Sequence, residues 1–337
     1  METPIMLRLL PALNFVFFAF SCLLFALPAK ADTAEFDAWV NELKAEARGK
    51  GISGQTLANA LDGVTFLPRV IELDRKQPEK TITFAEYRKG ILSDWRIQKG
   101  RKLIKKHENQ LKEVAAKYGV APQYIVALWG IETSYGQYTG GFDVIPALAT
   151  LAYDERRSAF FRKELLIALE ILDDGHVDPK NMRGSWAGAM GQNQFMPSSF
   201  QNFAVDYNGD GRRDIWDTQM DVFASSANYL SKSGWREGER WGRPVRIPVG
   251  LSDDLITKDV QKMLRQWSDL GVRRFDGSPL PIVDGFSASL VAPDGREGDI
   301  FLIYNNYRTI LKWNRSDYFA ASVGLLADRI AVALSDS

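Results

Sequence analysis

The sequence predicts a mainly helical α+β protein in which a small β subdomain interrupts a helical body. Apolar residues recur at helical spacing through much of 32–235 and again near the C-terminal end, which predicts helices that bury one face. From about residue 236 the pattern changes to short apolar runs separated by Asp-Gly turns, which predicts strands. The chain contains no internal repeat and no low-complexity segment.

Residues 1–31 have the features of a cleaved signal peptide. Arg8 precedes a long apolar run, and the segment ends in Ala29-Lys-Ala31, the small-x-small pattern that signal peptidases accept. Cys22 would be a lipidation site only if the three residues before it served as a lipobox, and the bulky Phe20 fits that motif poorly. We therefore expect a periplasmic protein that loses Cys22 with its signal.

Composition excludes several classes of function. The chain has 42 basic and 42 acidic residues, and loss of the signal, with two basic residues and one acidic, leaves a net charge of −1. This balance argues against nucleic-acid and anionic-membrane partners, and no later apolar segment is long enough to span a bilayer. Two histidines and no mature cysteine leave too few groups for a zinc site or a nucleophile–base pair. Any chemistry must therefore rest on carboxylates.

Spacing and punctuation residues predict the helices in order. A first amphipathic helix covers 36–43, and a linker marked by Pro68 and Pro78 follows. A long, heavily charged helical pattern then runs over 84–117. Pro122 suits the first turn of the next helix because its missing N–H would have no partner there. This helix and the later ones are predicted at 123–133, 160–172, 222–232 and 318–334.

The β-rich part is expected to contain four short strands and one helix. Asp-Gly pairs at 276–277 and 294–295 predict turns between strands. The strands are predicted at 245–249, 282–283, 288–291 and 300–303, and the helix at 258–270.

Glu132 is the first candidate for chemistry. It shares one helical face with Ile125, Leu128 and Trp129, so its carboxyl lies on an apolar stripe. Burial would raise the pKa of this carboxyl and keep its proton near neutral pH, as a general acid requires. A core glutamate neutralised by an arginine is the alternative. The segment 133–136 ends the helix directly afterwards, which favours a carboxyl that opens into a cleft.

The run 184–199 combines bare backbone with uncharged polar side chains. It holds three glycines together with serine, tryptophan, asparagine and glutamine, and none of its residues is charged. Neutral amide and hydroxyl groups beside glycine suit an uncharged, hydroxyl-rich ligand. A tight packing loop, in which glycine only lets backbones approach, explains the same residues equally well.

The run 206–217 has the spacing of a calcium-binding loop. Oxygen ligands at positions 1, 3, 5 and 12, glycine at position 6 and a backbone carbonyl at position 7 match the EF-hand pattern. Aspartate replaces the customary glutamate at position 12, which shortens its reach. We expect a structural Ca²⁺ and no organic cofactor. The predicted ligands are Asp206, Asn208, Asp210, the carbonyl of Arg212 and Asp217.

Two polar and aromatic runs, 304–308 and 313–318, precede the last helix. Each reads equally well as a polar turn with a helix cap at Ser316 or Asp317. Alone they are weak signals.

Taken together and in order, these motifs resemble the lytic murein transglycosylase B family. The resemblance covers nearly the whole mature chain. The runs that carry it are Gly130–Gly136, Gly184–Gly191 with Gln194–Ser199, the loop 206–217, Ala227–Leu230 and Trp313–Ser316.

The resemblance implies roles for single residues. Glu132 matches the sole catalytic acid/base of the family, Ser185 and Gln194 match groups that line the sugar cleft, Tyr229 matches an aromatic residue in it, and Asn314 matches an amide near the reacting sugar. The loop that begins at Asp206 matches the single calcium site. Two departures are Trp186 and Trp313, which stand where some members have tyrosine.

The resemblance also implies domains. A lysozyme-like core, 119–235, would contain the EF-hand-type loop 206–217. An N-terminal helical domain, 32–118, would be completed by the C-terminal helix, 316–337. A small β subdomain, 236–303, would be followed by a return segment, 304–315, that reaches the active-site cleft.

The chemistry that the resemblance implies needs one carboxylate. Glu132 would protonate the oxygen between N-acetylmuramic acid and N-acetylglucosamine, and then take the proton of the 6-hydroxyl as that oxygen attacks C1 and closes a 1,6-anhydro ring. Hydrolytic glycosidases normally use two carboxyl groups. A muramidase that uses Asp143 or Asp154 as the second one is the nearest alternative, and a non-catalytic murein-binding scaffold is another.

The expected partner is the peptidoglycan glycan strand. Proteins of cell-wall synthesis or division are further candidate partners, and the protein is expected to be a monomer.

Overall fold

The computed structural model describes residues 31–76 and 82–335. All but the last residue of the predicted signal peptide, together with Cys22 and Pro78, lie outside these ranges. Within them, no helix is both long and apolar enough to cross a membrane.

The described chain opens with the long helix α1 (Ala31–Gly49) and two short helices, α2 (Gly54–Leu61) and α3 (Pro68–Arg75). The expected linker therefore contains a helix. Pro68 starts α3 because its ring presets a helical φ and the missing N–H costs nothing in the first turn. Helix α2 packs on α9 and α3 packs on α8, two helices of the middle of the chain.

The predicted single helix over 84–117 is wrong, because this stretch forms three helices: α4 (Phe84–Ile91), α5 (Asp94–Lys106) and α6 (Glu108–Tyr118). Ser93 separates α4 from α5. Its hydroxyl accepts a hydrogen bond from the Arg96 amide and so caps the start of α5. His107 ends α5 and precedes α6. Gly119 ends α6 in the left-handed conformation, with φ 68°.

The middle of the chain forms α7 (Pro122–Thr133), α8 (Val144–Tyr153), α9 (Ser158–Asp173), α10 (Pro197–Phe203) and α11 (Gln219–Lys232). Helix α8 is absent from the sequence-based prediction. It is apolar on all sides and nearly all of its residues are buried, so it has no amphipathic stripe to detect. Two short strands, β1 (Phe142–Asp143) and β2 (Arg183–Gly184), pair antiparallel beside it.

The β subdomain is an antiparallel sheet with the strand order β4-β6-β7-β3-β5. Its elements are β3 (Gly242–Arg246), β4 (Lys262–Met263), α12 (Leu264–Asp269), β5 (Arg273–Arg274), β6 (Ser287–Val291) and β7 (Ile300–Ile303). It has its own core, in which the buried Trp267 donates its indole N–H to the carbonyl of Ala288 at 2.9 Å.

Two predictions in this subdomain are wrong. The stretch 282–283 forms no strand, because Pro281 before it lacks an amide hydrogen and Gly285 after it turns the chain with φ 72°. The helix predicted over 258–270 is confined to α12, because Lys262 and Met263 pair with β6 as strand β4.

The chain ends in α13 (Asn305–Trp313) and α14 (Asp317–Ser335). Helix α13 replaces the expected polar turn. Glu239 explains it, because its carboxylate accepts a hydrogen bond from the Asn305 amide at 2.6 Å at the start of α13. Helix α14 packs on α7 and α5.

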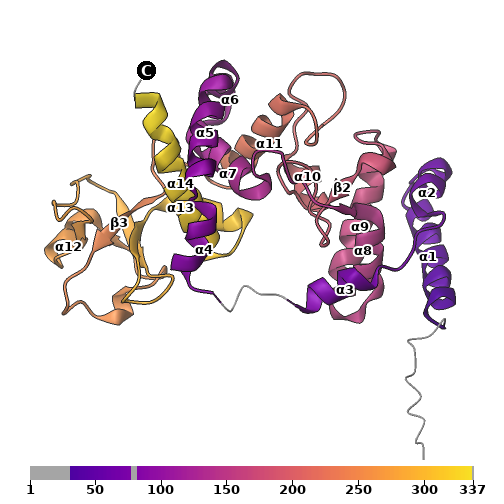
Figure 1. The fold of residues 1–337 in the computed structure, drawn as a ribbon, viewed down its shortest axis with the longest axis horizontal. Coiled ribbons are helices and arrows are strands. Elements are labelled where there is room, and N and C mark those ends of the chain that lie inside the picture. Colours follow the sequence, from indigo (N-terminus) through magenta and orange to yellow (C-terminus); the bar gives the residue numbers. More distant parts are fainter. Residues whose placement is uncertain (1–30, 77–81, 336–337) are drawn as a thin grey trace, which may run out of the picture.

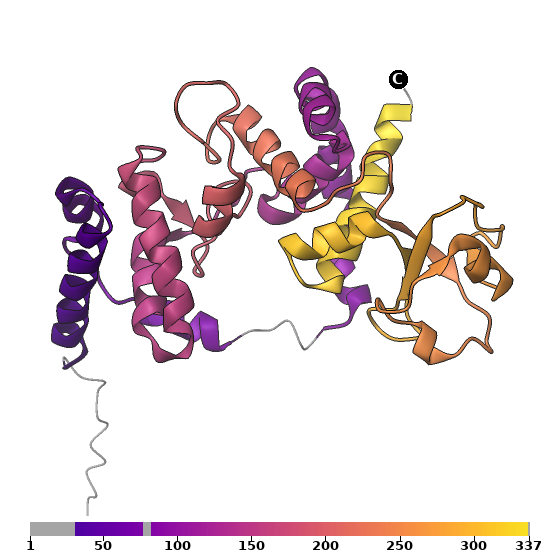
Figure 2. The ribbon, with the colours of Figure 1, turned by 180° about the vertical axis from the view of Figure 1, so that it is seen from behind.

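Figures 1 and 2 show the resulting arrangement along the long axis of the molecule. Helices α1 and α2 lie at one end, beside the pair α8 and α9, and the β subdomain lies at the other end. Between them stand α11, α7 and α14. The helices of the segment 32–118 thus contact two different regions, since α2 and α3 pack on α9 and α8 whereas α5 packs on α7 and α14. The predicted domain boundaries stay a prediction.

Candidate active site

Glu132 lies in the last turn of α7, a helix whose residues are otherwise mostly buried. The residue as a whole is only partly buried, although its carboxyl group is largely removed from water. The helix ends there because three successive residues, Ser134, Tyr135 and Gly136, take the left-handed conformation with φ 51°, 63° and 79°. Non-glycine residues rarely adopt this conformation, which indicates that surrounding contacts hold the turn.

Tyr135 supplies one such contact. Its hydroxyl donates a 2.6 Å hydrogen bond to the carbonyl of Arg96, and its ring packs directly on Gly130. A Cβ at Gly130 would lie 2.6 Å from the ring carbon Cε1 of Tyr135, so only glycine fits at that position. The turn after Glu132 is therefore anchored to α5 and to α7 itself.

In the part of the chain that the structure describes, the carboxyl of Glu132 has one hydrogen-bond donor. The indole N–H of Trp313 donates to Oε1 at 2.7 Å. Among the residues that the structure describes, Glu132 forms no ion pair; Arg96, at the same helix end, donates instead to the carbonyls of Gly90, Ile91 and Gly130. The arginine-neutralised alternative for Glu132 is thereby wrong.

The pKa of Glu132 is raised to about 7. Burial is the larger cause, because removal of water disfavours the charged form, and the bond from Trp313 acts in the opposite direction by stabilising the carboxylate. A carboxyl with this pKa is present in both protonation states at neutral pH, so it can first donate a proton and then accept one.

Gln192 joins α7 to the glycine-rich loop, and sequence reasoning missed it. Its carbonyl accepts the Thr133 hydroxyl at 3.1 Å, and its side chain accepts the Trp129 indole N–H at 2.8 Å and donates to the Trp216 carbonyl at 2.6 Å. Its own amide donates to the carbonyl of Ile215 at 2.8 Å. All four polar groups of Gln192 are used, which fixes the end of α7.

Ser185 and Gln194 lie in this loop, and the side chains of both bind backbone groups of the protein. The Ser185 hydroxyl accepts hydrogen bonds from the amides of Ala187 and Ala189 at 3.3 and 3.1 Å. Gln194 has a left-handed φ of 50°, and its amide donates to the carbonyls of Thr139 and Gly191 at 2.9 and 3.0 Å. Both residues shape the loop, and their contact with sugar stays a prediction.

An aromatic cluster positions Trp313. The ring centroid of Tyr229 lies 4.7 Å from that of Trp313 and 4.3 Å from that of Phe203. The ring centroids of Phe195 and Trp313 are 5.1 Å apart. The hydroxyl of the buried Tyr229 donates to the carbonyl of Lys312 at 2.6 Å, and burial raises the pKa of this hydroxyl. Tyr229 therefore holds the residue that binds Glu132.

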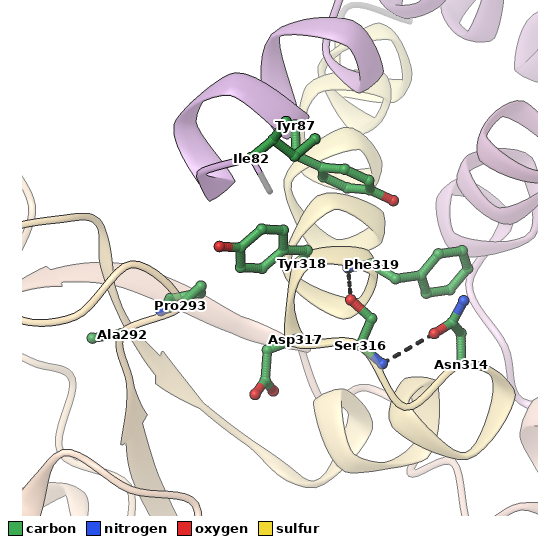
Figure 3. Close-up of a pocket in the computed structure, with 9 residues that line it drawn as sticks. All are labelled: Ile82, Tyr87, Ala292, Pro293, Asn314, Ser316, Asp317, Tyr318 and Phe319. Carbon is green, nitrogen blue, oxygen red and sulfur yellow. Dashed lines mark hydrogen bonds between the residues drawn. The ribbon is translucent and has the colours of Figure 1, made fainter. Parts of the chain in front are cut away.

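Asn314 lies next to Trp313 and lines a pocket of ≈ 580 Å³. Its side-chain oxygen accepts a hydrogen bond from the Ser316 amide at 3.0 Å (Figure 3). The pocket lies between α4, the β subdomain and the start of α14, and aromatic rings make up much of its wall. The other lining residues are Ile82, Tyr87, Ala292, Pro293, Ser316, Asp317, Tyr318 and Phe319.

The loop 206–217 does not form the metal-binding cluster that the sequence predicts. Within the described residues, no group of three or more His, Cys, Asp or Glu side chains is arranged to hold a metal ion. The Asp206 carboxylate accepts the amides of Gly209, Asp210 and Gly211 instead, and Asp210 accepts the Arg212 amide at 2.9 Å. The carboxylates are thus turned onto their own loop.

A further acid, Asp221, was missed because it lies beyond the twelve-residue spacing. It is fully buried and accepts the amides of Tyr207 and Asp214, each at 2.8 Å. Its pKa is raised, first by burial and in part by the negative charges of Asp206 and Asp210. Asp217, by contrast, is exposed. The two ends of the loop therefore meet at Asp221.

Comparison with known proteins identifies the family. The family model described as "Transglycosylase SLT domain" matches residues 35–328. The chain belongs to the transglycosylase SLT family. It is also 32% identical over 295 residues to the membrane-bound lytic murein transglycosylase B of Escherichia coli K12, which covers 84% of this chain and 80% of the relative.

Solved structures of transglycosylases share the fold. SltB3 from Pseudomonas aeruginosa, in complex with NAG-anhNAM-pentapeptide, matches with a TM-score of 0.84 and 44% identity over 88% of this chain and 79% of that one. The E. coli lytic transglycosylase Slt35 in complex with calcium matches with a TM-score of 0.74 and 30% identity over 90% of this chain and 94% of that one. The predicted lysozyme-like, mainly helical fold class is confirmed.

The two candidate second carboxylates of this transglycosylase are both bound to arginine. Asp143 pairs with Arg183 at 2.6 Å, and Asp154 pairs with Arg75 at 3.1 Å. Asp154 also accepts the amide of Arg156. Both carboxylates are therefore already engaged by an arginine side chain. Glu132 differs from both in that its pKa is raised and no arginine partner is recorded for it among the described residues.

Proposed function

We propose that this chain cleaves the β-1,4 bond between N-acetylmuramic acid and N-acetylglucosamine in peptidoglycan without water, leaving 1,6-anhydro ends, and that Glu132 is its sole catalytic acid/base. The observation that carries the proposal is the Glu132 carboxyl itself. It has a pKa near 7, one neutral donor and no recorded ionic partner among the described residues. The relative SltB3 is known in complex with an anhydro-muramoyl product, which supports the same reaction here.

The reaction proceeds in two proton transfers. Protonated Glu132 donates its proton to the glycosidic oxygen as the bond from that oxygen to C1 breaks. The resulting carboxylate then takes the proton from the sugar's 6-hydroxyl, whose oxygen forms a bond to C1 and closes the anhydro ring. The substrate thereby supplies the nucleophile, and the second carboxyl group of a hydrolase is not required.

Trp313 has a positioning role in this mechanism. Its indole N–H fixes the orientation of the carboxyl and stabilises the charge that appears when Glu132 has given up its proton. We further propose that Ser185, Gln194, Tyr229 and Asn314 line the sugar cleft. Tyr229 would act largely through the ring of Trp313, which it contacts, and Asn314 through its side-chain amide next to the reacting sugar.

Calcium is proposed as a structural ion in the loop 206–217. The donor set consists of hard oxygen atoms, which suit Ca²⁺, and a cation would relieve the repulsion between Asp221 and the two loop carboxylates. Asp206, Asn208, Asp210, the carbonyl of Arg212 and Asp217 are the proposed ligands, with Asp221 as a further candidate. When bound, the ion would supply stability rather than chemistry.

The calcium proposal is tested by thermal unfolding of the parent chain and of Asp210→Ala, with calcium and with a chelator. We expect calcium to raise the melting temperature of the parent only, because the ion binds the folded loop. An unchanged melting temperature in the parent contradicts the proposal.

We also propose that the protein is exported to the periplasm and that residues 1–31 are its signal peptide. A named relative is membrane-bound in E. coli, and peptidoglycan lies outside the inner membrane.

Product analysis tests the function. Purified sacculi are digested with the chain, and the released sugars are identified by mass spectrometry. We expect anhydro-muramoyl ends. Reducing N-acetylmuramic acid ends would instead identify a hydrolytic muramidase, and binding to sacculi without any release would identify a scaffold.

A further inference from the structure

The β subdomain contains a pocket of ≈ 260 Å³ on the strands β3 and β5. It lies apart from Glu132. Trp241, next to Arg240, donates its amide to the hydroxyl of Tyr124 in the first turn of α7, and Glu132 stands eight residues further along that helix, about 12 Å away along the axis. The lining residues are Arg240, Arg243, Pro244, Arg274, Phe275 and Asp276.

The strand register brings the arginines together. Val245 of β3 pairs with Arg274 of β5, and Arg243 lies two residues before Val245. Because alternate residues of a strand project from the same face, Arg243 and Arg274 leave the sheet on one side. Arg240 adds a third guanidinium from the segment that enters β3.

Positive charge in this pocket is only partly neutralised. Asp328 of α14 pairs with Arg240 at 3.0 Å and also accepts the indole N–H of Trp241 at 3.1 Å. Asp276 accepts hydrogen bonds from the amide and hydroxyl of Ser278. Arg243 and Arg274 have no carboxylate partner recorded among the described residues.

Arg243 is also incompletely hydrogen-bonded. Its Nε atom is buried and lacks a hydrogen-bond partner of good geometry, as does the hydroxyl of Tyr304, over whose ring the guanidinium lies at 5.7 Å. Tyr304 is only 3% exposed. The Tyr304 hydroxyl interacts with the Arg243 side chain, so the pocket is identified by its three guanidinium groups and not by a missing acceptor.

The pocket is rigid on its inner side. The fully buried ring of Trp241 packs on Gly324 of α14, where a Cβ would lie 2.1 Å from the ring carbon Cδ2. On its outer side the ring of Phe275 is 59% exposed and lies 5.2 Å from the guanidinium of Arg246. A group of guanidiniums with an apolar rim suits a small oxyanion attached to a short apolar group.

We propose that this pocket binds a carboxylate of the peptides attached to the murein strand, at a site separate from the cleavage site. The proposal rests on peptidoglycan being the substrate. A volume of ≈ 260 Å³ accommodates a carboxylate with one or two small residues and no long polymer. Peptide carboxylates are the acidic groups that such a substrate presents at high local density, and the site would hold one strand while a neighbouring bond is cleaved.

The test uses binding alone, so that its outcome is independent of catalysis. A Glu132→Gln chain is titrated calorimetrically with a murein pentapeptide and with the same peptide amidated at its carboxyl groups. We expect the free peptide to bind and the amidated peptide to bind at least tenfold more weakly. Equal binding of the two peptides, or binding of neither, overturns the proposal.

Two variants of this chain locate the site. Arg274 is exposed, so Arg274→Gln leaves the core intact, and we expect it to weaken peptide binding at least tenfold. Arg243→Gln should have the same effect. Arg265→Gln is the matched control, because it removes the same charge from an exposed position of α12 and should change binding by less than twofold. Equal effects of Arg274→Gln and Arg265→Gln overturn the assignment.

Inorganic phosphate separates the two sources of an oxyanion. Phosphate should compete with the peptide for the parent site. Binding of phosphate in the absence of any peptide binding overturns the assignment to peptide carboxylates.

Discussion

Glu132 in the last turn of α7 and Asp210 in the loop 206–217 are both carboxylic acids, yet their surroundings shift their pKa values in opposite directions. Burial raises the pKa of Glu132 to about 7, and its single donor is a neutral indole. The pKa of the exposed Asp210 is lowered, first by the hydrogen bond from the Arg212 amide and then by the side chain of Asn208. The number of donors and the access of water decide the difference.

This contrast shows that a carboxyl group serves either in proton transfer or in holding a loop, depending on its surroundings. A carboxylate surrounded by amide donors stays charged and holds a loop in one conformation. A carboxyl denied such donors keeps its proton and can transfer it. The most direct way to break the contrast is therefore to alter Glu132 and its few neighbours.

Replacement of Glu132 by glutamine is expected to have the largest effect. Glutamine keeps the shape but cannot exchange a proton, so we expect kcat on purified sacculi to fall by about 10³-fold or more. Asp143→Asn is the matched control and should retain most activity, because that carboxylate is paired with Arg183 on the surface. Equal losses in the two variants would contradict the assignment of Glu132 as sole acid.

Gly140→Ala should disrupt the backbone around the site. A Cβ at Gly140, where φ is +111°, would lie 1.9 Å from the carbonyl oxygen of Gly184. We expect a loss of about 3 kcal/mol in the free energy of unfolding, from the backbone conformation and the clash together. Gly250→Ala is the control, since its Cβ would meet no atom within 4 Å. Chemical denaturation measures both, and similar stabilities would refute the predicted contact.

The raised pKa of Glu132 predicts a pH-dependent cost in stability. The unfolded side chain ionises near pH 4.3 and the folded one near 7, so the folded state holds the extra proton between these values. Stability should therefore fall as pH rises from about 4.5 to 7. Glu132→Gln removes this cost, and we expect it to be about 1–3 kcal/mol more stable than the parent at pH 8 and no more stable at pH 4. Parallel urea titrations at the two pH values check this, and a constant difference would contradict it.

Trp313→Phe should sharpen the comparison by removing the one hydrogen-bond donor to Glu132 that is recorded within residues 31–76 and 82–335. Because the indole hydrogen bond favours the carboxylate, its loss raises the pKa further, and the basic limb of the kcat/KM profile should move up by about one pH unit. Trp186→Phe is the matched control and should leave that limb in place. A downward shift in Trp313→Phe would show that the bond acts on the protonated form.

Features that depend on the local pattern of residues could be predicted from the sequence. Helix α7 begins at Pro122 as expected and carries Glu132 in its last turn. The family resemblance, based on several ordered motifs, is confirmed. The raised pKa of Glu132 also followed from its place on an apolar face.

Features that depend on distant contacts could not be predicted. Helix α13 starts where Glu239, 66 residues earlier, accepts the Asn305 amide. The bond from Trp313 to Glu132 spans 181 residues. Helix α8 has no polar face, since it is covered on all sides, and therefore has no periodic signal.

The contacts of Gln192 bear on how the sequence of this enzyme can diverge during evolution. Its four polar groups bind the hydroxyl of Thr133, the indole N–H of Trp129 and the backbone carbonyls of Ile215 and Trp216. All four partners belong to the protein, so these contacts do not depend on the sugar that is bound. Side chains facing the glycan can therefore be exchanged without displacing the proton donor. Substrate preference and bond cleavage can thus be altered separately, by natural divergence or by engineering.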